Sequence, residues 1–414
     1  MARTDTLVLG AGIVGTSIAL HLAKRGLSVA LVDRRAPGEE TSYGNTGVIG
    51  STVYPAAFPR DLARLAAAAF KLAPSVNYHA LFLPRILPWL MAFRAASSLP
   101  CRAETARVMR PLMGRAVAEH ATLLAESGAA RHLRKSGMLT LYRTSAAVSE
   151  LARELALAAE LGVTTRRCDP DEAVELEPGL APVFRSAVHW PAVASLSDPL
   201  AVTRAYAKRC AALGGVVLAG DAATLHRAAG RWRVDTSEGP VDADDAVVAL
   251  GPWSPDLLKP RGIRLPLAVK RGYHRHFRPR GNSGLQRPVV DVENGYALGP
   301  MERGIRLTTG AEFASRDAPP TPVQLDRALP IARALAPLGE PVETTPWMGS
   351  RPCFADSRPV IGPAPGHPGL WLAFGHGHVG LTLGPVTGRL LAEMITGAVP
   401  FCDPAPFRAE RFNQ

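Results

Sequence analysis

Thr6-Leu-Val-Leu-Gly10-Ala-Gly12-Ile-Val-Gly15 is the stretch that decides the fold of this 414-residue chain. Its apolar run is typical of a parallel strand buried on both faces, and it leads directly into the spacing G-x-G-x-x-G. Apolar positions over 13–25 then predict a helix that ends at Gly26, and residues 28–33 predict a second strand. Strand, glycine turn, helix and strand within about 30 residues form a βαβ unit.

Asp33 follows Gly12 by 21 residues, at the end of the second predicted strand. In this position a carboxylate accepts hydrogen bonds from the ribose hydroxyls of a dinucleotide, whose pyrophosphate lies at the helix N-terminus. The carboxylate disfavours the 2′-phosphate of NADP, although Arg34 and Arg35 follow it. A lone G-x-G-x-x-G is a weak signal, but this context favours dinucleotide binding and leaves FAD and NAD open.

Nucleotide-fold patterns return in two later parts of the chain. A helical stretch over 199–213 leads to short strands between 216 and 250, and a buried strand over 370–374 leads into a glycine-rich turn and a helix over 386–395. Between these parts, residues 263–313 predict an antiparallel sheet. Alanine-rich segments with helical spacing predict an inserted helical region, and they span 60–73, 103–127 and 146–161.

The chain is basic, with lysine and arginine exceeding aspartate and glutamate by 47 − 36 = 11. A positive field attracts phosphates, so nucleic-acid binding has to be weighed. The arginines are scattered along the whole chain, without a basic tail or a run longer than two. This distribution favours an arginine-rich composition and anionic small ligands, and we expect no nucleic-acid partner.

Five widely spaced cysteines without a C-x-x-C pair favour a reducing compartment, without structural disulfides or zinc. They are Cys101, Cys168, Cys210, Cys353 and Cys402. The N-terminus runs directly into the first strand, without the basic and apolar regions of a secretory signal. We therefore expect a cytoplasmic protein. We expect no metal site at His376 and His378, since no third ligand stands at a recognisable spacing.

The most apolar later stretch runs from 80 to 99. Pro84, Arg85, Pro88 and Arg94 interrupt it, so it falls short of the roughly 20 uninterrupted apolar residues that cross a bilayer. Peripheral contact with the inner face of the cell membrane stays open.

Five segments, in this order, resemble the D-amino-acid dehydrogenase and glycine-oxidase branch of the FAD-dependent amino-acid oxidoreductases. They are Gly10 to Gly15, Thr41-Ser-Tyr-Gly-Asn-Thr-Gly47, Val247-Val-Ala-Leu-Gly-Pro-Trp-Ser254, Arg351-Pro352 with Pro359-Val-Ile-Gly362, and Phe374-Gly-His-Gly-His-Val-Gly-Leu-Thr-Leu-Gly384. The resemblance covers nearly the whole chain and selects FAD. It implies an α/β fold with a discontinuous Rossmann-like FAD-binding domain and a mixed-sheet substrate domain that carries the helical insertion. The predicted FAD-binding pieces are 1–80, 191–260 and 346–414, and the others are 81–190 and 261–345.

The resemblance also implies which residues contact the cofactor. The loop with Ser42 and Asn45 lies along the ribityl chain and pyrophosphate, and the glycines from Gly375 onward allow close backbone approach to the flat flavin ring. The helix after that turn directs its N-terminus at the pyrimidine side, where negative charge accumulates on reduction. The predicted set is Gly10, Gly12, Ile13, Val14, Gly15, Asp33, Arg34, Ser42, Asn45, Gly47, Ala223, Ala249, Gly251, Gly375, Gly377, Val379, Gly380, Leu381 and Thr382.

Arg351 resembles the arginine with which this family binds a substrate carboxylate, through two parallel hydrogen bonds from a planar guanidinium. Tyr296 resembles the tyrosine that adds a second carboxylate contact, with Tyr273 as its rival. His376 and His378 complete the predicted catalytic set, in which one histidine contacts the flavin or the substrate and the other fills a turn.

The implied reaction is oxidation of a D-amino acid to its imino acid, by hydride transfer from Cα to flavin N5. The stretch from Tyr54 to Arg60 is similar to the branch that acts on D-proline and 4-hydroxy-D-proline. Other substrates stay open: a broad range of D-amino acids such as D-alanine, or glycine or sarcosine. The sequence does not decide whether the electron acceptor is a quinone, another carrier or dioxygen. It also leaves open the oligomeric state. Cys353 is either covalently bonded to the flavin or a buried, unreactive thiol. The alternative to an enzyme is a redox-silent subunit that binds FAD within a larger complex.

Overall fold

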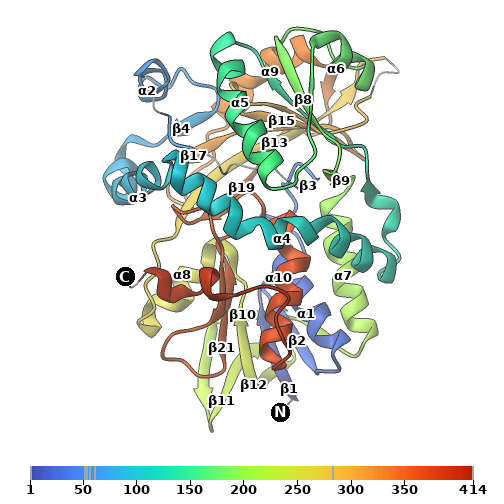
Figure 1. Ribbon diagram of the computed structural model, residues 1–414. Helices are drawn as coiled ribbons and strands as arrows, with labels where there is room; N and C mark the ends of the chain where they lie inside the picture. Colours follow the sequence, from blue (N-terminus) through green and yellow to red (C-terminus); the bar gives the residue numbers. More distant parts are fainter. Residues whose placement is uncertain (1, 51–54, 56, 60–61, 282–283, 413–414) are drawn as a thin grey trace.

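The computed structural model describes residues 2–50, 55, 57–59, 62–281 and 284–412. Figure 1 shows two sheets: a largely parallel sheet in the lower half and a larger mixed sheet in the upper half. The long helix α4 (Leu99–Glu126) runs across the middle of the molecule. The chain passes between the halves several times, so each half is assembled from separated segments.

The lower sheet has seven strands, of which β10, β2, β1, β12 and β21 pair in parallel in that order. The strands are β1 (Ala2–Leu9), β2 (Val29–Asp33), β10 (Val216–Ala228), β11 (Arg231–Thr236), β12 (Gly239–Val248), β20 (Val360–Pro363) and β21 (Leu370–Phe374). Leu9 lies opposite both Val32 and Val248, so the carboxyl ends of the three central strands meet at one edge. Ligands of such sheets bind at this edge.

The upper sheet has eleven strands around β13, which pairs antiparallel with β16, β17, β18 and β19. It is mixed because β6 pairs in parallel with β14, and β4 with β17. Its strands are β4 (Val76–Tyr78), β6 (Met138–Tyr142), β7 (Arg166–Cys168), β8 (Ser186–Trp190), β13 (Ala268–Pro279), β14 (Val289–Asp291), β15 (Tyr296–Met301), β16 (Gly304–Thr308), β17 (Ala311–Phe313), β18 (Leu338–Pro341) and β19 (Trp347–Cys353). A small third sheet joins β3 (Val48–Ile49), β9 (Ala194–Leu196) and β5 (Leu133–Arg134).

Helices cover both sheets with their apolar sides. Residues of α1 (Ile13–Lys24), α4, α7 (Pro199–Ala212) and α10 (Gly380–Ile395) share one core with β1 and β2. The remaining helices are α2 (Leu62–Ala69), α3 (Leu83–Ala96), α5 (Ser145–Glu160), α6 (Pro170–Leu176), α8 (Ser254–Leu258) and α9 (Val323–Leu335). Short 3₁₀ turns are η1 (Ala80–Phe82), η2 (Ala130–His132), η3 (Gly251–Trp253), η4 (Lys259–Arg261), η5 (Ala405–Phe407) and η6 (Ala409–Phe412).

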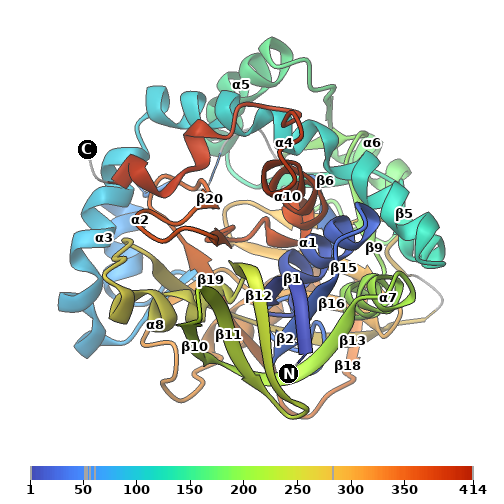
Figure 2. The ribbon, with the colours of Figure 1, turned by 90° about the horizontal axis from the view of Figure 1, so that it is seen from below.

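Helices α1 and α10 cross in close contact because α10 presents glycines to α1. A Cβ atom on Gly388 would lie 2.6 Å from the backbone carbon and oxygen of Ser17, and one on Gly384 would lie 3.0 Å from Ile13 Cγ1. Figure 2 shows the two helices side by side. This crossing brings both helix N-termini to the edge where β1 and β12 end.

Helix α10 begins at Gly380, six residues before the predicted start, and therefore contains Pro385. Pro385 has no N–H to donate to the carbonyl oxygen of Leu381. His120 Nε2 lies 2.7 Å from that oxygen and fills the missing donor role, while His120 Nδ1 lies 3.0 Å from the Tyr206 hydroxyl. Burial keeps this imidazole neutral by lowering its pKa to about 4. A buried histidine on α4 thus allows residues 380–385 to be helical, although the sequence predicts a turn for them.

The structure confirms the predicted α/β fold with its discontinuous Rossmann-like part and its mixed sheet. Two strands lie in a different sheet from the one that the predicted pieces imply. β4 falls in the piece 1–80 but pairs with β17, and β19 falls in the piece 346–414 but pairs with β13. A short apolar strand does not reveal its partner in the sequence, so the exchange of these strands between sheets was not readable.

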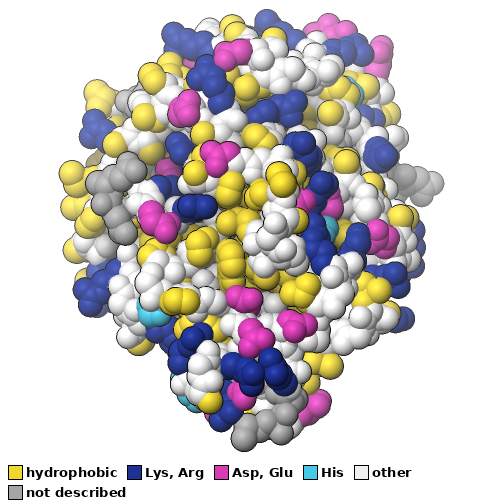
Figure 3. Space-filling model, turned by 60° about the horizontal axis from the view of Figure 1, so that its bottom comes forward, with side chains coloured by type: hydrophobic (Ala, Val, Ile, Leu, Met, Phe, Trp, Pro, Cys, Tyr) yellow, Lys and Arg dark blue, Asp and Glu magenta, His cyan; other side chains and the backbone are white. Residues whose placement is uncertain are grey.

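None of the helices among the described residues is long and apolar enough to cross a membrane. On the face shown in Figure 3, lysine and arginine side chains are mixed with acidic ones and do not gather into one basic field.

We predict that Gly388→Ala lowers the free energy of unfolding by about 1–3 kcal/mol, because the new methyl group overlaps the backbone of Ser17 and forces α10 away from α1. Urea denaturation followed by circular dichroism measures the change. Gly284→Ala is the matched control, since Gly284 is exposed and a Cβ there meets no atom within 4 Å. Equal losses in both variants would contradict the proposed importance of the helix crossing.

Candidate active site

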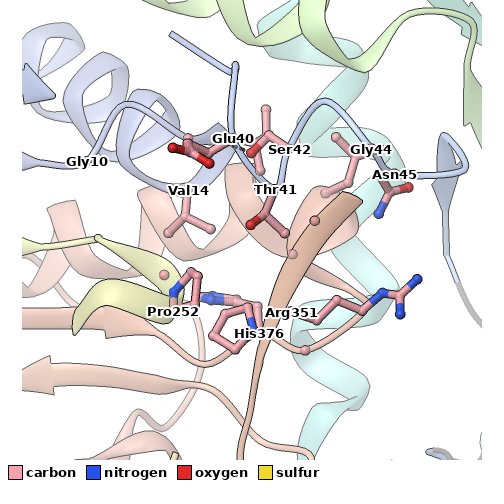
Figure 4. Close-up of a pocket in the computed structure, with 18 of the residues that line it drawn as sticks. Gly10, Val14, Glu40, Thr41, Ser42, Gly44, Asn45, Pro252, Arg351 and His376 are labelled. Atoms are coloured by element: carbon pink, nitrogen blue, oxygen red, sulfur yellow. Dashed lines mark hydrogen bonds between the residues drawn. The ribbon is translucent and has the colours of Figure 1, made fainter. Parts of the chain in front are cut away.

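A cavity of about 560 Å³ lies between the two sheets. Its floor is the edge where β1, β2 and β12 end, and its far wall comes from β13, β15, β16 and β19. In Figure 4 the loop residues from Glu40 to Asn45 lie on one side of the cavity, and Pro252, His376 and Arg351 lie on the other. The cavity therefore contacts all three pieces of the discontinuous fold as well as the mixed sheet.

Most of the predicted site residues line this one cavity. They are Gly10, Gly12, Ile13, Val14, Asp33, Arg34, Ser42, Asn45, Ala223, Ala249, Gly251, Arg351, Gly375, His376, Gly377, His378, Val379, Gly380, Leu381 and Thr382. The first and last of these residues, Gly10 and Thr382, are 372 positions apart in the chain and still meet at this single site.

Gly15 and Gly47 lie next to the cavity but do not line it. A Cβ on Gly15 would lie 1.8 Å from Gly10 O, so this glycine lets α1 pack against the turn before it. Gly47 has a φ of +83°, and a Cβ there would lie 2.3 Å from Leu196 O. Both glycines are required for close packing around the site and not for contact within it.

Tyr296 does not line the cavity, which corrects its predicted position at the substrate. Successive strand residues point to opposite faces, and in β15 it is Ala297 that faces the cavity. The Tyr296 side chain is buried on the other face, where Arg143 Nη2 lies 3.4 Å from its hydroxyl. Burial, together with the nearby Asp291 carboxylate, raises the pKa of Tyr296.

Tyr273, the rival tyrosine, does line the cavity, but its hydroxyl is engaged elsewhere. This hydroxyl donates to Glu312 Oε2 at 2.5 Å and accepts from the backbone N–H of Thr321 at 2.9 Å and from Arg271 Nη2 at 3.0 Å. Burial raises the pKa of Tyr273, so the hydroxyl stays protonated at neutral pH. Each of the two tyrosine hydroxyls is therefore held in a buried network with an acid and an arginine.

Two helix N-termini open into the cavity, and neither N-cap residue caps its helix with its own side chain. Gly12 caps α1 and Val379 caps α10, and neither first turn contains an acidic residue. Ser42 Oγ accepts the N–H of Ile13 at 2.9 Å, which holds the loop after β2 against α1. Free N–H groups and the positive ends of two helix dipoles form a site for an anion such as a pyrophosphate.

Asp33 is fixed at the end of β2 by two backbone donors. Its Oδ2 accepts the N–H of Ala11 at 2.6 Å and its Oδ1 accepts the N–H of Arg35 at 3.0 Å. The neighbouring Arg34 guanidinium lies 4.5 Å from the centre of the Trp253 ring, so the side chain stacks beside the cavity. A rigid carboxylate with remaining acceptor positions suits the ribose hydroxyls of a dinucleotide.

The turn after β21 is held against the end of β19. Gly377 donates its N–H to Pro352 O at 2.8 Å, and Gly375 leaves no room for a side chain, since a Cβ there would lie 2.1 Å from the Phe354 ring. His376 Nε2 lies 3.0 Å from the Thr387 hydroxyl, which fixes this imidazole to α10. Burial lowers the pKa of His376 to about 3, so the ring is neutral.

His378 lines the cavity, and its side chain is exposed there. Partial loss of hydration between the cavity walls, reinforced by the positive charges of Lys270 and Arg351, lowers its pKa. Both predicted histidines therefore present neutral imidazoles at physiological pH. Among the described residues, no group of three His, Cys, Asp or Glu side chains gathers as a metal site.

Arg351 is a half-buried cation on the wall of the cavity. Its Nη1 donates to Gly310 O at 2.6 Å and its Nη2 donates to Thr309 O at 3.1 Å. The guanidinium fits over Gly272, where a Cβ would lie 2.4 Å from both Nη atoms. In the described part of the chain no carboxylate pairs with Arg351, so its remaining N–H donors can bind an anion.

A second half-buried cation lies beside Arg351. Lys270 stands opposite Arg351 in the pairing of β13 with β19. Its Nζ lies 4.2 Å from the centre of the Phe93 ring and 4.8 Å from that of Trp89. Aromatic faces stabilise such a cation, while burial lowers its pKa. Two adjacent cations give this end of the cavity a positive potential.

The sequence reasoning missed an apolar part of the cavity wall. Met138, Val290, Ala297 and Trp347 come from four strands of the mixed sheet and line the cavity together. Alternation within each strand marks such residues as facing one side, but the sequence does not show which strands meet across the cavity. The missed residues at the opposite end are acidic or small: Glu40, Gly220, Asp221, Ala222 and Asp256.

Two other predicted features are not among the lining residues that the structure describes. Cys353 is buried, its Sγ lies 3.5 Å from Arg351 O, and burial raises the pKa of its thiol. The stretch from Tyr54 to Arg60 falls partly outside the described residues, which include only positions 55 and 57–59 of it.

Comparison with known proteins places this cavity in context. The family profile described as "DAO: FAD dependent oxidoreductase" matches residues 5–394. A protein of Chromohalobacter salexigens named "D-amino acid dehydrogenase" is 32% identical over 422 residues, covering 99% of each chain. A "D-amino-acid oxidase" of Bradyrhizobium diazoefficiens is 29% identical and covers 98% of each chain. Among solved structures, glycine oxidase from Geobacillus kaustophilus matches with a TM-score of 0.77 at 24% identity, covering 99% of each chain.

We predict that the folded protein loses stability as the pH falls from 6.5 to 5. An unfolded histidine binds a proton near pH 6.5, whereas buried neutral rings such as His120 and His376 stay unprotonated down to about pH 4 and 3. The unfolded state therefore binds more protons, and each such ring lowers the stability by up to about 1.4 kcal/mol per pH unit. Urea midpoints of the holoprotein at a series of pH values measure this slope.

A variant pair assigns the slope to burial. His120→Gln should flatten the pH dependence, whereas His226→Gln, at an exposed position, should leave it unchanged. A midpoint that stays constant or rises as the pH falls from 6.5 to 5 would contradict the neutral state of the buried rings.

Proposed function

Since the chain belongs to the DAO family of FAD-dependent oxidoreductases, we propose that it oxidises D-amino acids at Cα. The observation that carries this proposal is Arg351, a half-buried guanidinium on the cavity wall whose remaining donors suit a carboxylate. The names of the relatives in Chromohalobacter and Bradyrhizobium support an amino acid of D configuration.

FAD is the cofactor of this family, and the residues of the cavity fit it. The uncapped N-termini of α1 and α10 suit the pyrophosphate and the electron-rich side of the ring, and Asp33 suits the ribose. The Ser42 to Gly47 loop and the Gly375 to Thr382 turn supply a backbone-lined channel between them. When bound, FAD supplies the acceptor for the hydride that the substrate loses.

The chain's own part in the reaction is to bind and orient the substrate. Arg351 holds the carboxylate, and its two carbonyl partners fix the plane of the guanidinium before substrate arrives. A clamped carboxylate restricts rotation of the substrate and sets which Cα–H faces the cofactor. Lys270 adds positive potential at the same end without reaching the cavity wall.

The described residues that line the cavity offer no ionised side-chain base near Arg351. His376 and His378 are neutral, and His376 Nε2 is engaged with Thr387. The proposed route does not need such a base, since the substrate amine enters neutral and its lone pair assists as the hydride leaves Cα. The resulting imino acid takes up water and splits into a keto acid and ammonia, or methylamine in the case of sarcosine. It stays cyclic when the amine nitrogen is part of a ring, as in proline.

The apolar wall supports a neutral, apolar substrate side chain. Met138, Val290, Ala297 and Trp347 can pack against an aliphatic group or a pyrrolidine ring. Among the described lining residues that the mixed sheet supplies, Arg351 is the one with a charged side chain. D-proline, 4-hydroxy-D-proline and apolar D-amino acids therefore lead the substrate panel, and glycine and sarcosine complete it.

The electron acceptor is proposed to be a quinone or another carrier and not dioxygen, as in a dehydrogenase. Parallel measurement of peroxide formation and of dye reduction with the same substrate distinguishes the two. A peroxide yield that matches substrate consumption would make the protein an oxidase and would overturn the acceptor assignment while leaving the substrate assignment intact.

We predict that Arg351→Met raises KM for the preferred amino acid by about 100-fold while the flavin stays bound. Removing one partner of a buried charged hydrogen bond costs about 2–5 kcal/mol. Steady-state kinetics with a dye acceptor measure the effect, and flavin absorbance per protein checks retention. Arg280→Met, at an exposed position, is the matched control. An unchanged KM in the Arg351 variant would remove the assigned role.

We further predict that the flavin absorbance of the purified protein bleaches under anaerobic conditions with D-amino acids and not with their L enantiomers. Proline, 4-hydroxyproline, alanine, glycine and sarcosine form the panel. Bleaching by L enantiomers alone would reverse the proposed configuration. A yellow protein that no amino acid bleaches would favour the redox-silent FAD-binding subunit instead.

A further inference from the structure

A buried arginine of the mixed sheet contacts the loop that follows β2 on the other side of the cavity. Arg306 lies on β16, two residues before Thr308, which faces the cavity from the same side of the strand. Its Nη1 donates to two backbone oxygens of the loop, to Tyr43 O at 2.8 Å and to Asn45 O at 2.5 Å. One guanidinium thus binds two carbonyl groups of a segment that belongs to the opposite half of the molecule.

The loop needs such contacts because residues 34–47 form neither helix nor strand. Its cavity-lining members are Glu40, Thr41, Ser42, Gly44, Asn45 and Thr46. Tyr43 is not among them, and the Arg306 guanidinium lies 5.3 Å from the centre of its ring. A Cβ on Gly44 would lie 1.7 Å from Trp347 Cζ3, so the loop also packs directly on an indole of β19. The mixed sheet therefore contacts three consecutive residues of the loop.

Arg306 is an isolated charge in the interior. It is 3% exposed, and among the described residues no carboxylate pairs with it. Burial lowers its pKa to about 10, so the guanidinium stays charged at neutral pH. A buried charge destabilises a fold unless its donors are used. Three N–H groups of Arg306 are used, two by the loop and one by His276.

His276 and Glu343 fix the orientation of this guanidinium. His276 stands directly opposite Arg306 in the pairing of β13 with β16, and its Nε2 accepts the Arg306 Nε–H at 3.0 Å. Since Nε2 accepts, the imidazole carries its proton on Nδ1, which donates to Glu343 Oε1 at 2.6 Å. Burial and the Arg306 charge lower the pKa of His276 to about 4, so this neutral form persists at physiological pH. A carboxylate, an imidazole, a guanidinium and the loop form one chain of hydrogen bonds.

We propose that Arg306 is a positioning residue for FAD, which holds the segment from Tyr43 to Asn45 in the conformation that contacts the cofactor. This inference rests on the proposed contact of the loop with FAD. Arg306 is not among the described lining residues, so its effect on FAD passes through the loop. Binding of the cofactor thus depends on the mixed sheet, although the dinucleotide motif belongs to the other sheet.

Serial dilution of the holoprotein tests the proposal, since the flavin fluorescence released at each concentration gives the Kd of FAD. We predict that Arg306→Met raises this Kd at least about tenfold, because the loop loses two charge-assisted hydrogen bonds. Arg306→Lys keeps the charge but cannot reach His276 and both carbonyl oxygens together, so we expect a smaller rise, of about threefold. Arg278→Met, at an exposed position of β13, is the matched control and should leave the Kd unchanged.

Hydrogen–deuterium exchange at saturating FAD separates positioning of the loop from a general loss of stability. In Arg306→Met, peptides that cover residues 40–47 should exchange faster, while those of β1 and β2 keep the wild-type rate. A Kd within about twofold of the wild-type value would overturn the proposal, and so would equally faster exchange in the loop and in both strands. If Arg306→Met does not fold, the same two measurements on Arg306→Lys decide. Neither measurement uses a substrate, so this inference and the proposed oxidation of D-amino acids fail or stand separately.

Discussion

The crossing of α1 and α10 is the contact on which the site depends. Gly384 and Gly388 remove the side chains that would hold the helices apart, so the N-terminus of each helix reaches the end of a parallel strand. Two positive helix ends then face one cavity from segments more than 350 positions apart in the chain. Pro385 lacks the backbone N–H that would donate to the Leu381 carbonyl oxygen. His120 replaces it and donates to that oxygen through Nε2.

The two ends of the cavity differ in their charged side chains. Asp33, Asp221 and Asp256 line the end beside β2 and β10 together with Arg34, and their carboxylates can accept hydrogen bonds from the hydroxyl and amino groups of a nucleotide. Arg351, with Lys270 behind it, makes the other end positive, and the imidazoles between them are neutral. The cavity therefore offers separate binding sites to a long ligand with a polar nucleotide end and to a small anionic ligand.

The sequence predicted those features that depend on short-range pattern. The glycines after β1, the acid at the end of β2 and the glycine-rich turn after β21 all carry their meaning in local spacing, and they line the same cavity. The prediction for Tyr296 was wrong about its position because a shift of one residue along a strand reverses the face, and the motif did not fix that phase. The apolar wall, the partner of β19 and the role of His120 depend on which distant segments pack together, and single-sequence pattern contains no such information.

Gly272 has a consequence for how this scaffold can diversify. The guanidinium of Arg351 occupies the volume in which every other residue type would place its Cβ, so the anchor for an acid depends on an atom that is missing from the facing strand. A single methyl group introduced there would displace the anchor without altering the arginine itself. Descendants of this chain that act on amines without an acid group could thus arise through the neighbouring strand, with the arginine codon still unchanged.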